Sequence, residues 1–175
     1  MSRARVLVVD DKENMLKLFA RILGEGYELA TASEGDRALA LVGAQEFDVV
    51  VTDLRMPGAD GFEVLKAVKA RSPDTEVVMM TAYATVADAV EAMKQGAYDY
   101  LTKPFDPDAA ALVVERAVER KRLREQAASL RRELEGVFSF HSLVGKSAAM
   151  KDVYRLLEQA AGLDITVLLT GGTGT

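Results

Sequence analysis

One stretch, residues 47–58, restricts the fold of this chain more than any other. It begins with Val49, Val50 and Val51, a run of β-branched apolar residues that is typical of a strand buried on both faces. The run reaches Asp53 and is followed by a Pro-Gly turn at 57–58. Open α/β sheets place their chemistry at the carboxyl ends of the strands, so the sequence predicts that Asp53 lies at a functional edge.

Short apolar runs alternate with amphipathic helical patterns five times along the chain. Strands are expected near 5–9, 27–32, 47–52, 76–80 and 98–101, and the last helical pattern extends from about 107 to 135. This alternation predicts a parallel sheet with right-handed crossovers and helices on both faces. The carboxyl ends of the strands are then expected to meet at one edge.

Composition excludes several classes of function. The chain carries a net charge of −5, and residues 1–114 hold 12 basic and 19 acidic side chains, which argues against nucleic acid as their direct partner. The chain has no cysteine, so a disulfide framework and a thiolate zinc site are excluded. We find no signal peptide and no apolar run of membrane-spanning length, and expect a cytoplasmic protein without a membrane partner.

Polar residues end four of the five predicted strands. Three carboxylates at one edge would repel one another unless a cation lies among them, and Mg²⁺, which prefers oxygen ligands, is the simplest solution. Asp11 and Asp53 are expected to coordinate it directly and Asp10 through water. The backbone carbonyl near Arg55 is expected to add a ligand. The polar side chains expected at this edge are Asp10, Asp11, Asp53, Thr81 and Lys103.

Asp53 at such a site would act as a nucleophile that accepts a phosphoryl group and forms a mixed anhydride. Lys103 would supply positive charge to a phosphoryl oxygen and Thr81 a hydroxyl donor. Each residue also has a purely structural interpretation. Asp10 and Asp11 would cap the first helix, Thr81 would satisfy a strand end, and Lys103 would be solvated. The coincidence of all of them at one predicted edge favours the functional interpretation.

Four short motifs contain these residues: Val8-Val9-Asp10-Asp11, Asp53-Leu54-Arg55-Met56-Pro57-Gly58, Met80-Thr81-Ala82 and Leu101-Thr102-Lys103-Pro104-Phe105. Together they resemble the receiver domain of two-component response regulators over about residues 3–120. The resemblance implies a five-stranded flavodoxin-like (βα)5 fold, a doubly wound parallel sheet, in a domain at 1–120 whose fifth helix covers about 107–120. It implies that Asp53 is the phosphoacceptor and that Asp10 and Asp11 are the acidic pair of the Mg²⁺ site. Thr81 and Lys103 would be the switch hydroxyl and the phosphate-contacting lysine.

The same resemblance assigns a switch role to Tyr100. Its side chain would turn inward when Thr81 moves toward the phosphoryl group, whereas the structural alternative is a half-exposed strand tyrosine. The resemblance also implies a cis peptide bond between Lys103 and Pro104. Tyr83 would gate the access of water to the phosphoryl group.

Residues 115–135 have a different composition, rich in Arg, Glu, Leu and Ala without Gly or Pro, and the linker is expected at 121–136. Leu123, Ala127, Leu130 and Leu134 are spaced four, three and four apart, which predicts a short coiled-coil seam in a helical dimerisation linker. Extending the seam backward would place Arg120 at a core position, so it is expected to begin near 120. The alternative is a single amphipathic helix packed on its own chain.

Residues 137–175 resemble the opening of the AAA+ ATPase domain of sigma-54-dependent activators of the NtrC type. A helix is expected around Met150, and a strand at 165–170 leads into the glycine-rich end of the chain. That end is the start of a P-loop without its lysine, so ATP would bind only in a longer parent protein. We therefore expect a piece of a longer chain. The residues of the incomplete P-loop are Gly171, Gly172, Thr173 and Gly174.

The leading hypothesis is a phosphoacceptor regulatory domain rather than an enzyme that turns over a substrate. A histidine kinase would be the phosphoryl donor, and a homodimer would form through the linker and the face of the fourth helix, fifth strand and fifth helix. Sigma-54 RNA polymerase and DNA would be reached only through domains beyond this sequence. One alternative is a constitutive dimerisation module with a vestigial site. Another is an aspartate-nucleophile phosphatase, which Arg55 disfavours because such enzymes carry a second acid two residues after the nucleophile.

Overall fold

The computed structural model describes residues 3–83, 85–137, 139–140, 143–144, 147–161, 166 and 168. The chain divides after Glu125 into two compact units, which are described separately below. Among the residues that the structure describes, no helix is both long and apolar enough to cross a membrane.

The first unit is built on a five-stranded sheet in which every neighbouring pair is parallel. The strand order is β2-β1-β3-β4-β5, so the chain moves outward from β1 in both directions. This order confirms the doubly wound flavodoxin-like fold, with β1 and β3 side by side in its middle. The strands are β1 (Arg5–Val9), β2 (Glu28–Ala32), β3 (Val49–Asp53), β4 (Glu76–Thr81) and β5 (Asp99–Thr102).

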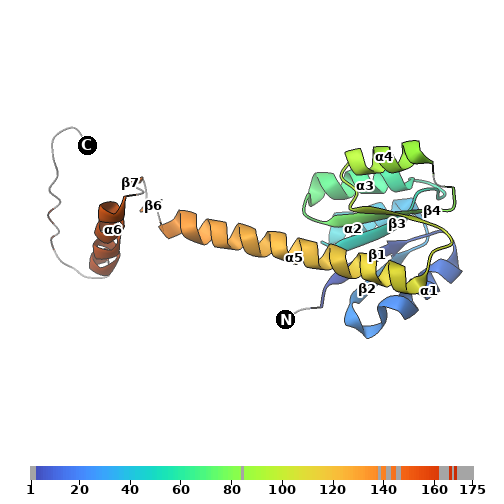
Figure 1. The fold of residues 1–175 in the computed structure, drawn as a ribbon, viewed down its shortest axis with the longest axis horizontal. Helices are drawn as coiled ribbons and strands as arrows, with labels where there is room; N and C mark the ends of the chain where they lie inside the picture. The colour runs from blue at the N-terminus through green and yellow to red at the C-terminus, as the bar shows by residue number, and fades with distance from the viewer. Residues whose placement is uncertain are drawn as a thin grey trace. The chain divides into compact units, whose positions relative to one another are not determined.

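Helices cover both faces of this sheet (Figure 1). Alternate residues of each strand point to opposite faces, so Val6 and Val8 join one apolar core while Leu7 and Val9 join the other. The first core also contains apolar side chains of α1 and α5, and the second those of α2, α3 and α4. The helices are α1 (Glu13–Leu23), α2 (Gly35–Ala44), α3 (Gly61–Arg71), α4 (Val86–Lys94) and α5 (Pro107–Val137), with a 3₁₀ turn η1 (Gly24–Gly26) after α1.

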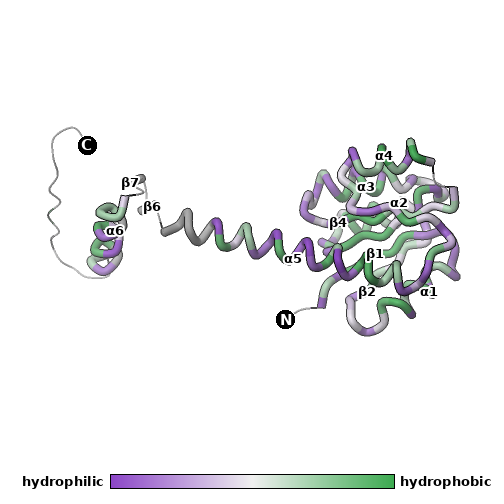
Figure 2. Tube along the Cα trace, in the orientation of Figure 1, coloured by the Kyte–Doolittle hydropathy of each residue, from purple (hydrophilic) through white to green (hydrophobic). Residues whose placement is uncertain are grey.

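Hydropathy follows these layers (Figure 2). The strands are largely hydrophobic, and all residues of β3 and β4 are buried. This is the expected pattern for central parallel strands, because helices exclude water from both of their faces. The sequence of α5 is more hydrophilic than the strands, as is typical of a helix with much of its surface exposed.

The turn after β3 is fixed by one glycine and one capping box. A Cβ on Gly61 would lie 2.4 Å from the carbonyl oxygen of Asp53, so only glycine permits this close approach. Asp60 then caps α3, because its side chain accepts a hydrogen bond from the Glu63 N–H while Glu63 accepts one from the Asp60 N–H. These contacts hold the chain segment that follows Asp53.

The second unit contains α6 (Ala148–Ala161) and a short antiparallel pair, β6 (Ser139–Phe140) with β7 (Leu143–Val144). The helix expected around Met150 is confirmed, and the Met150 N–H donates to the Ser147 hydroxyl at its start. Of the strand expected at 165–170, only Thr166 and Leu168 are described, and neither lies in a strand. The incomplete P-loop, Gly171, Gly172, Thr173 and Gly174, lies outside the described residues.

Candidate functional site

Three carboxylates converge at the carboxyl edge of the two central strands. Asp53 is the last residue of β3, and Asp10 and Asp11 follow β1, its neighbour in the sheet. One carboxylate oxygen of each residue lies within 4.8 Å of those of the other two. Asp10 is fully buried and Asp53 is 6% exposed, whereas Asp11 is exposed to solvent. Strand order therefore brings together the acids that the sequence separates by more than forty positions.

Lys103 lies between the two buried acids. Its Nζ is 2.5 Å from Oδ2 of Asp10 and 3.0 Å from Oδ2 of Asp53, and its side chain is 8% exposed. The lysine follows β5, and its own N–H donates to the Thr81 carbonyl at the end of β4. The interpretation of Lys103 as a solvated surface residue is therefore wrong.

The remaining oxygens of the two buried acids bind the backbone. Oδ1 of Asp10 accepts from the Lys12 N–H at 2.9 Å, and Oδ1 of Asp53 accepts from the Leu54 N–H at 2.8 Å. The structural alternative, in which Asp10 and Asp11 cap α1, does not hold, because Lys12 occupies the N-cap position and α1 has no side-chain cap. The two buried carboxylates are thus held in place by short contacts from both sides.

The charge and chemistry of this cluster fit a divalent metal ion. Three carboxylates against one lysine leave a formal excess of two negative charges, two of the acids being buried. Crowded carboxylates repel one another, and an oxygen-rich donor set is the one that Mg²⁺ prefers. Asp10, Asp11 and Asp53 are the residues that would hold it.

Thr81 and Tyr100 lie beside this cluster on neighbouring strands. Thr81 ends β4, is 1% exposed, and its hydroxyl accepts from the Tyr83 N–H at 3.2 Å. Tyr100 is partly exposed, yet its hydroxyl is a buried atom that makes no hydrogen bond within the described part of the chain. Burial raises the pKa of Tyr100 and the charge of Asp88 raises it further, while the Thr81 hydroxyl acts in the opposite direction.

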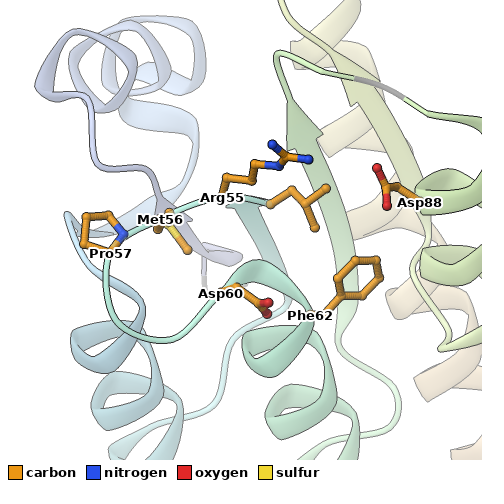
Figure 3. A pocket seen from close by; sticks show the side chains of 7 residues that line it. Arg55, Met56, Pro57, Asp60, Phe62 and Asp88 are labelled. Carbon is orange, nitrogen blue, oxygen red and sulfur yellow. The ribbon is translucent and has the colours of Figure 1, made fainter.

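A shallow hollow of about 460 Å³ opens next to the cluster, between the turn after β3 and the start of α4 (Figure 3). Arg55 and Asp88 line it from these two elements, and Phe62 lies below them. The Arg55 guanidinium carbon is 5.9 Å from the ring centre of Tyr83, a residue that is 72% exposed. This cation–π pair joins the turn after β3 to the segment after β4. Sequence reasoning named Arg55 for its carbonyl and as evidence against a phosphatase, and it did not find Asp88.

Lys103 and Pro104 are joined by a cis peptide bond, as the resemblance implied. The next residue, Phe105, packs against Phe19 of α1 with a distance of 5.9 Å between ring centres. This contact joins the segment after β5 to α1. Lys103 is therefore held between β5, which precedes it, and Phe105, which packs on α1.

Comparison with known proteins gives a consistent result. The family described as response regulator receiver domain matches residues 6–115. The DNA-binding transcriptional regulator NtrC of Salmonella typhimurium is 38% identical over 176 residues, which cover 100% of this chain and 37% of NtrC. The crystal structure of NtrX from Brucella abortus aligns with a TM-score of 0.70 and 36% identity over 91% of this chain and 35% of NtrX. The chain thus spans little more than a third of the length of these proteins.

Proposed function

The chain belongs to the response regulator receiver domain family, and on that basis we propose that it accepts a phosphoryl group on Asp53 and reports this state to a neighbouring domain. The geometry of Asp53 carries the proposal. Its carboxylate is nearly buried at the end of β3, with Oδ1 bound by the Leu54 N–H and Oδ2 by Lys103. An aspartate with a purely structural role does not require two other acids within 4.8 Å.

The transfer step breaks one bond and forms another. An oxygen of the Asp53 carboxylate attacks the phosphorus of a phosphohistidine or acyl phosphate, and the bond to the donor nitrogen or oxygen breaks with its electron pair. The product is an aspartyl phosphate. Bound Mg²⁺, held by Asp10, Asp11, Asp53 and the Arg55 carbonyl, would neutralise charge on the incoming group.

Lys103 and Thr81 act on the oxygens of the transferred group. Lys103 already touches Asp53, so its ammonium group needs only to exchange a carboxylate oxygen for a phosphoryl oxygen. Thr81 offers a hydroxyl donor at the end of the adjacent strand. These two residues stabilise negative charge without themselves being modified.

Tyr100 would couple this chemistry to the surface. Its buried hydroxyl, which makes no hydrogen bond in the described part of the chain, lies near Thr81, and movement of Thr81 toward a phosphoryl group would change the space available to the ring. A side chain with two alternative positions can shift its population in this way, because the modification changes the contacts available in each.

The relatives support a proposal for the larger arrangement of the protein. We propose a receiver domain at 1–120, a helical dimerisation linker at 121–136 and the start of an AAA+ domain at 137–175. NtrC and NtrX match this chain over nearly its whole length, which supports such an order. A histidine kinase would be the donor. Control of sigma-54 RNA polymerase at DNA would require domains beyond this sequence.

A homodimer would use the linker and the face of α4, β5 and α5. Val86, Val90 and Met93 of α4 are spaced on one side of the helix and are 46% to 83% exposed. Leu112, Leu123 and Leu130 of α5 are 43% to 60% exposed. Such exposure of large apolar side chains is the usual mark of an interaction surface.

The deciding experiment measures the phosphoryl adduct. The chain is incubated with Mg²⁺ and acetyl phosphate, and intact mass is recorded for the parent chain, Asp53→Ala and the exposed-acid control Asp74→Asn. One adduct is expected in the parent and in the control and none in Asp53→Ala. Retention of the adduct without Asp53 would overturn the assignment. Continuous release of phosphate would favour the phosphatase alternative.

A further inference from the structure

Two acidic residues lie at the opposite, amino-terminal edge of the sheet, at the starts of β3 and β4. Asp48 directly precedes β3, and Glu76 is the first residue of β4. Val49 pairs with Glu76 in the sheet, and the Glu76 N–H donates to the Asp48 carbonyl at 3.1 Å, so the two acids are neighbours. Each strand thus has an acid at one end and a site residue, Asp53 or Thr81, at the other.

Glu76 is a buried carboxylate that binds α5. Its side chain is 2% exposed, and its Oε1 lies 3.2 Å from Nε of Arg120 and 3.1 Å from a terminal nitrogen of Arg124. Lys69 of α3 lies 3.9 Å from Oε2. A buried carboxylate is costly unless it is paired, so α5 must stay in place for Glu76 to remain satisfied.

Asp48 forms a second attachment one residue along the helix. Its Oδ1 lies 2.9 Å from Nζ of Lys121, which also donates to the Phe47 carbonyl, while its Oδ2 accepts from the Arg5 N–H. Lys121 is 8% exposed. Burial lowers the pKa of Lys121, but the hydrogen bonds and charges of Asp48 and Glu125 together outweigh this and raise it.

Between residues 120 and 125, these contacts occupy one side of α5, and the opposite side is exposed. Leu123 follows Lys121 by two residues, about 200° around the helix, and is 58% exposed. Arg120 is bound to Glu76 and to the Tyr98 ring, 5.2 Å from its guanidinium carbon, so it is not a residue of a dimer seam. Because Leu123 is exposed, it does not pack against the first unit, residues 1–125.

We propose that Asp48 and Glu76 are positioning residues, which fasten the 120–125 turns of α5 to the strands that carry Asp53 and Thr81. A displacement of either strand then moves the beginning of the linker helix as part of the same packed body. The proposal that α5 is fastened to β3 and β4 rests on the contacts described above. The transmission of a signal through it rests on the phosphoryl transfer proposed above.

The fastening is tested by hydrogen exchange, read by mass spectrometry on peptides that cover α5. Arg124→Gln combined with Lys121→Gln should raise exchange at 120–125 by about tenfold or more, because these amides then open without global unfolding. Glu76→Gln should act in the same direction. Arg122→Gln, an exposed control on the same turn, should leave exchange unchanged. Exchange equal to the parent chain in the double variant, with unchanged protection of β3, would overturn the proposal.

Transmission is tested on the same samples with beryllofluoride as a phosphoryl mimic. Binding at Asp53 is followed by fluorine NMR, and the exchange of the 120–130 peptides is compared with and without the mimic. The parent chain should show a change that the double variant loses while still binding the mimic. A change that survives in the variant would refute transmission, as would no change in a parent chain that binds. Failure of the parent to bind would refute the proposed function, and the unliganded exchange would still decide the fastening.

Discussion

Replacing Asp11 by asparagine should have opposite effects on stability without and with Mg²⁺. Asp11 is the exposed member of the three acids, and Lys103 is bound to the other two. The three carboxylate oxygens lie within 4.8 Å of one another, and at that upper limit two unit charges repel by roughly 1 kcal/mol in water-like surroundings and roughly 3.5 kcal/mol at an effective dielectric constant of about 20. Because Asp11 is exposed, the lower figure applies. Without metal, Asp11→Asn should therefore raise the free energy of unfolding by about 1 kcal/mol and the melting temperature by roughly 3–5 °C.

Mg²⁺ should reverse this order. A ligand that binds only the folded state stabilises it by about 2.7 kcal/mol when its concentration is about 100 times its dissociation constant. The parent chain should gain this stabilisation, and the variant, which lacks one carboxylate ligand, should gain much less. The two melting temperatures, followed by circular dichroism in EDTA and then with increasing MgCl₂, should cross.

Two controls make the result decisive. Asp74→Asn removes an exposed acid outside the cluster and should leave both the metal-free stability and the response to Mg²⁺ unchanged. Sodium chloride at matched ionic strength should not reproduce the crossing, since it only screens charge. If Asp11→Asn were less stable than the parent in EDTA, or if it kept the full response to Mg²⁺, the account of these acids as a crowded cation site would be wrong.

Three further changes test other parts of the structure. Tyr100→Phe removes a buried hydroxyl that makes no hydrogen bond to the described residues, and it should stabilise the chain by about 1 kcal/mol near neutral pH. The folded-state pKa of Tyr100 is raised, so the parent chain loses stability as pH rises above about 10 and the advantage of the variant should grow. Denaturation followed from pH 8 to 11 measures this difference. Gly61→Ala should destabilise the chain by about 1–3 kcal/mol, because the added Cβ meets rigid backbone. A Cβ added at Gly43 has no atom within 4 Å, so Gly43→Ala should not destabilise the chain. Urea titrations of both variants measure the difference. Leu123→Asn with Leu130→Asn should weaken dimers at least tenfold in analytical ultracentrifugation, and unchanged dimer affinity would remove α5 from the interface.

Much of the fold could be predicted because it depends on local patterns. Buried parallel strands need continuous apolar residues and their crossover helices need one apolar face, so both leave a signature in every short segment. The same logic placed Asp53 at a strand end, and the resemblance implied the flavodoxin-like fold. Boundaries moved by one or two residues, as for β3, expected at 47–52 and found at Val49–Asp53.

Charge pairing could not be predicted in the same way. Arg120 follows a heptad spacing and was considered as an extension of the seam, but its partner is Glu76, which belongs to a different strand. No pattern along the helix shows which carboxylate lies opposite, because that depends on how α5 crosses the sheet. The burial of Glu76 is equally hidden, since a glutamate at the start of a strand is usually solvated.

The sequence by itself determined which side chains end the strands, and hence that Asp10, Asp11, Asp53, Thr81 and Lys103 belong to one edge. Only the tertiary structure decided that Lys103 bridges Asp10 and Asp53, and that the buried Tyr100 hydroxyl makes no hydrogen bond to the residues that the structure describes. The reason is physical. Periodicity records whether a residue faces a core or solvent, whereas a specific ionic contact depends on distances of 3–4 Å between elements far apart in the chain.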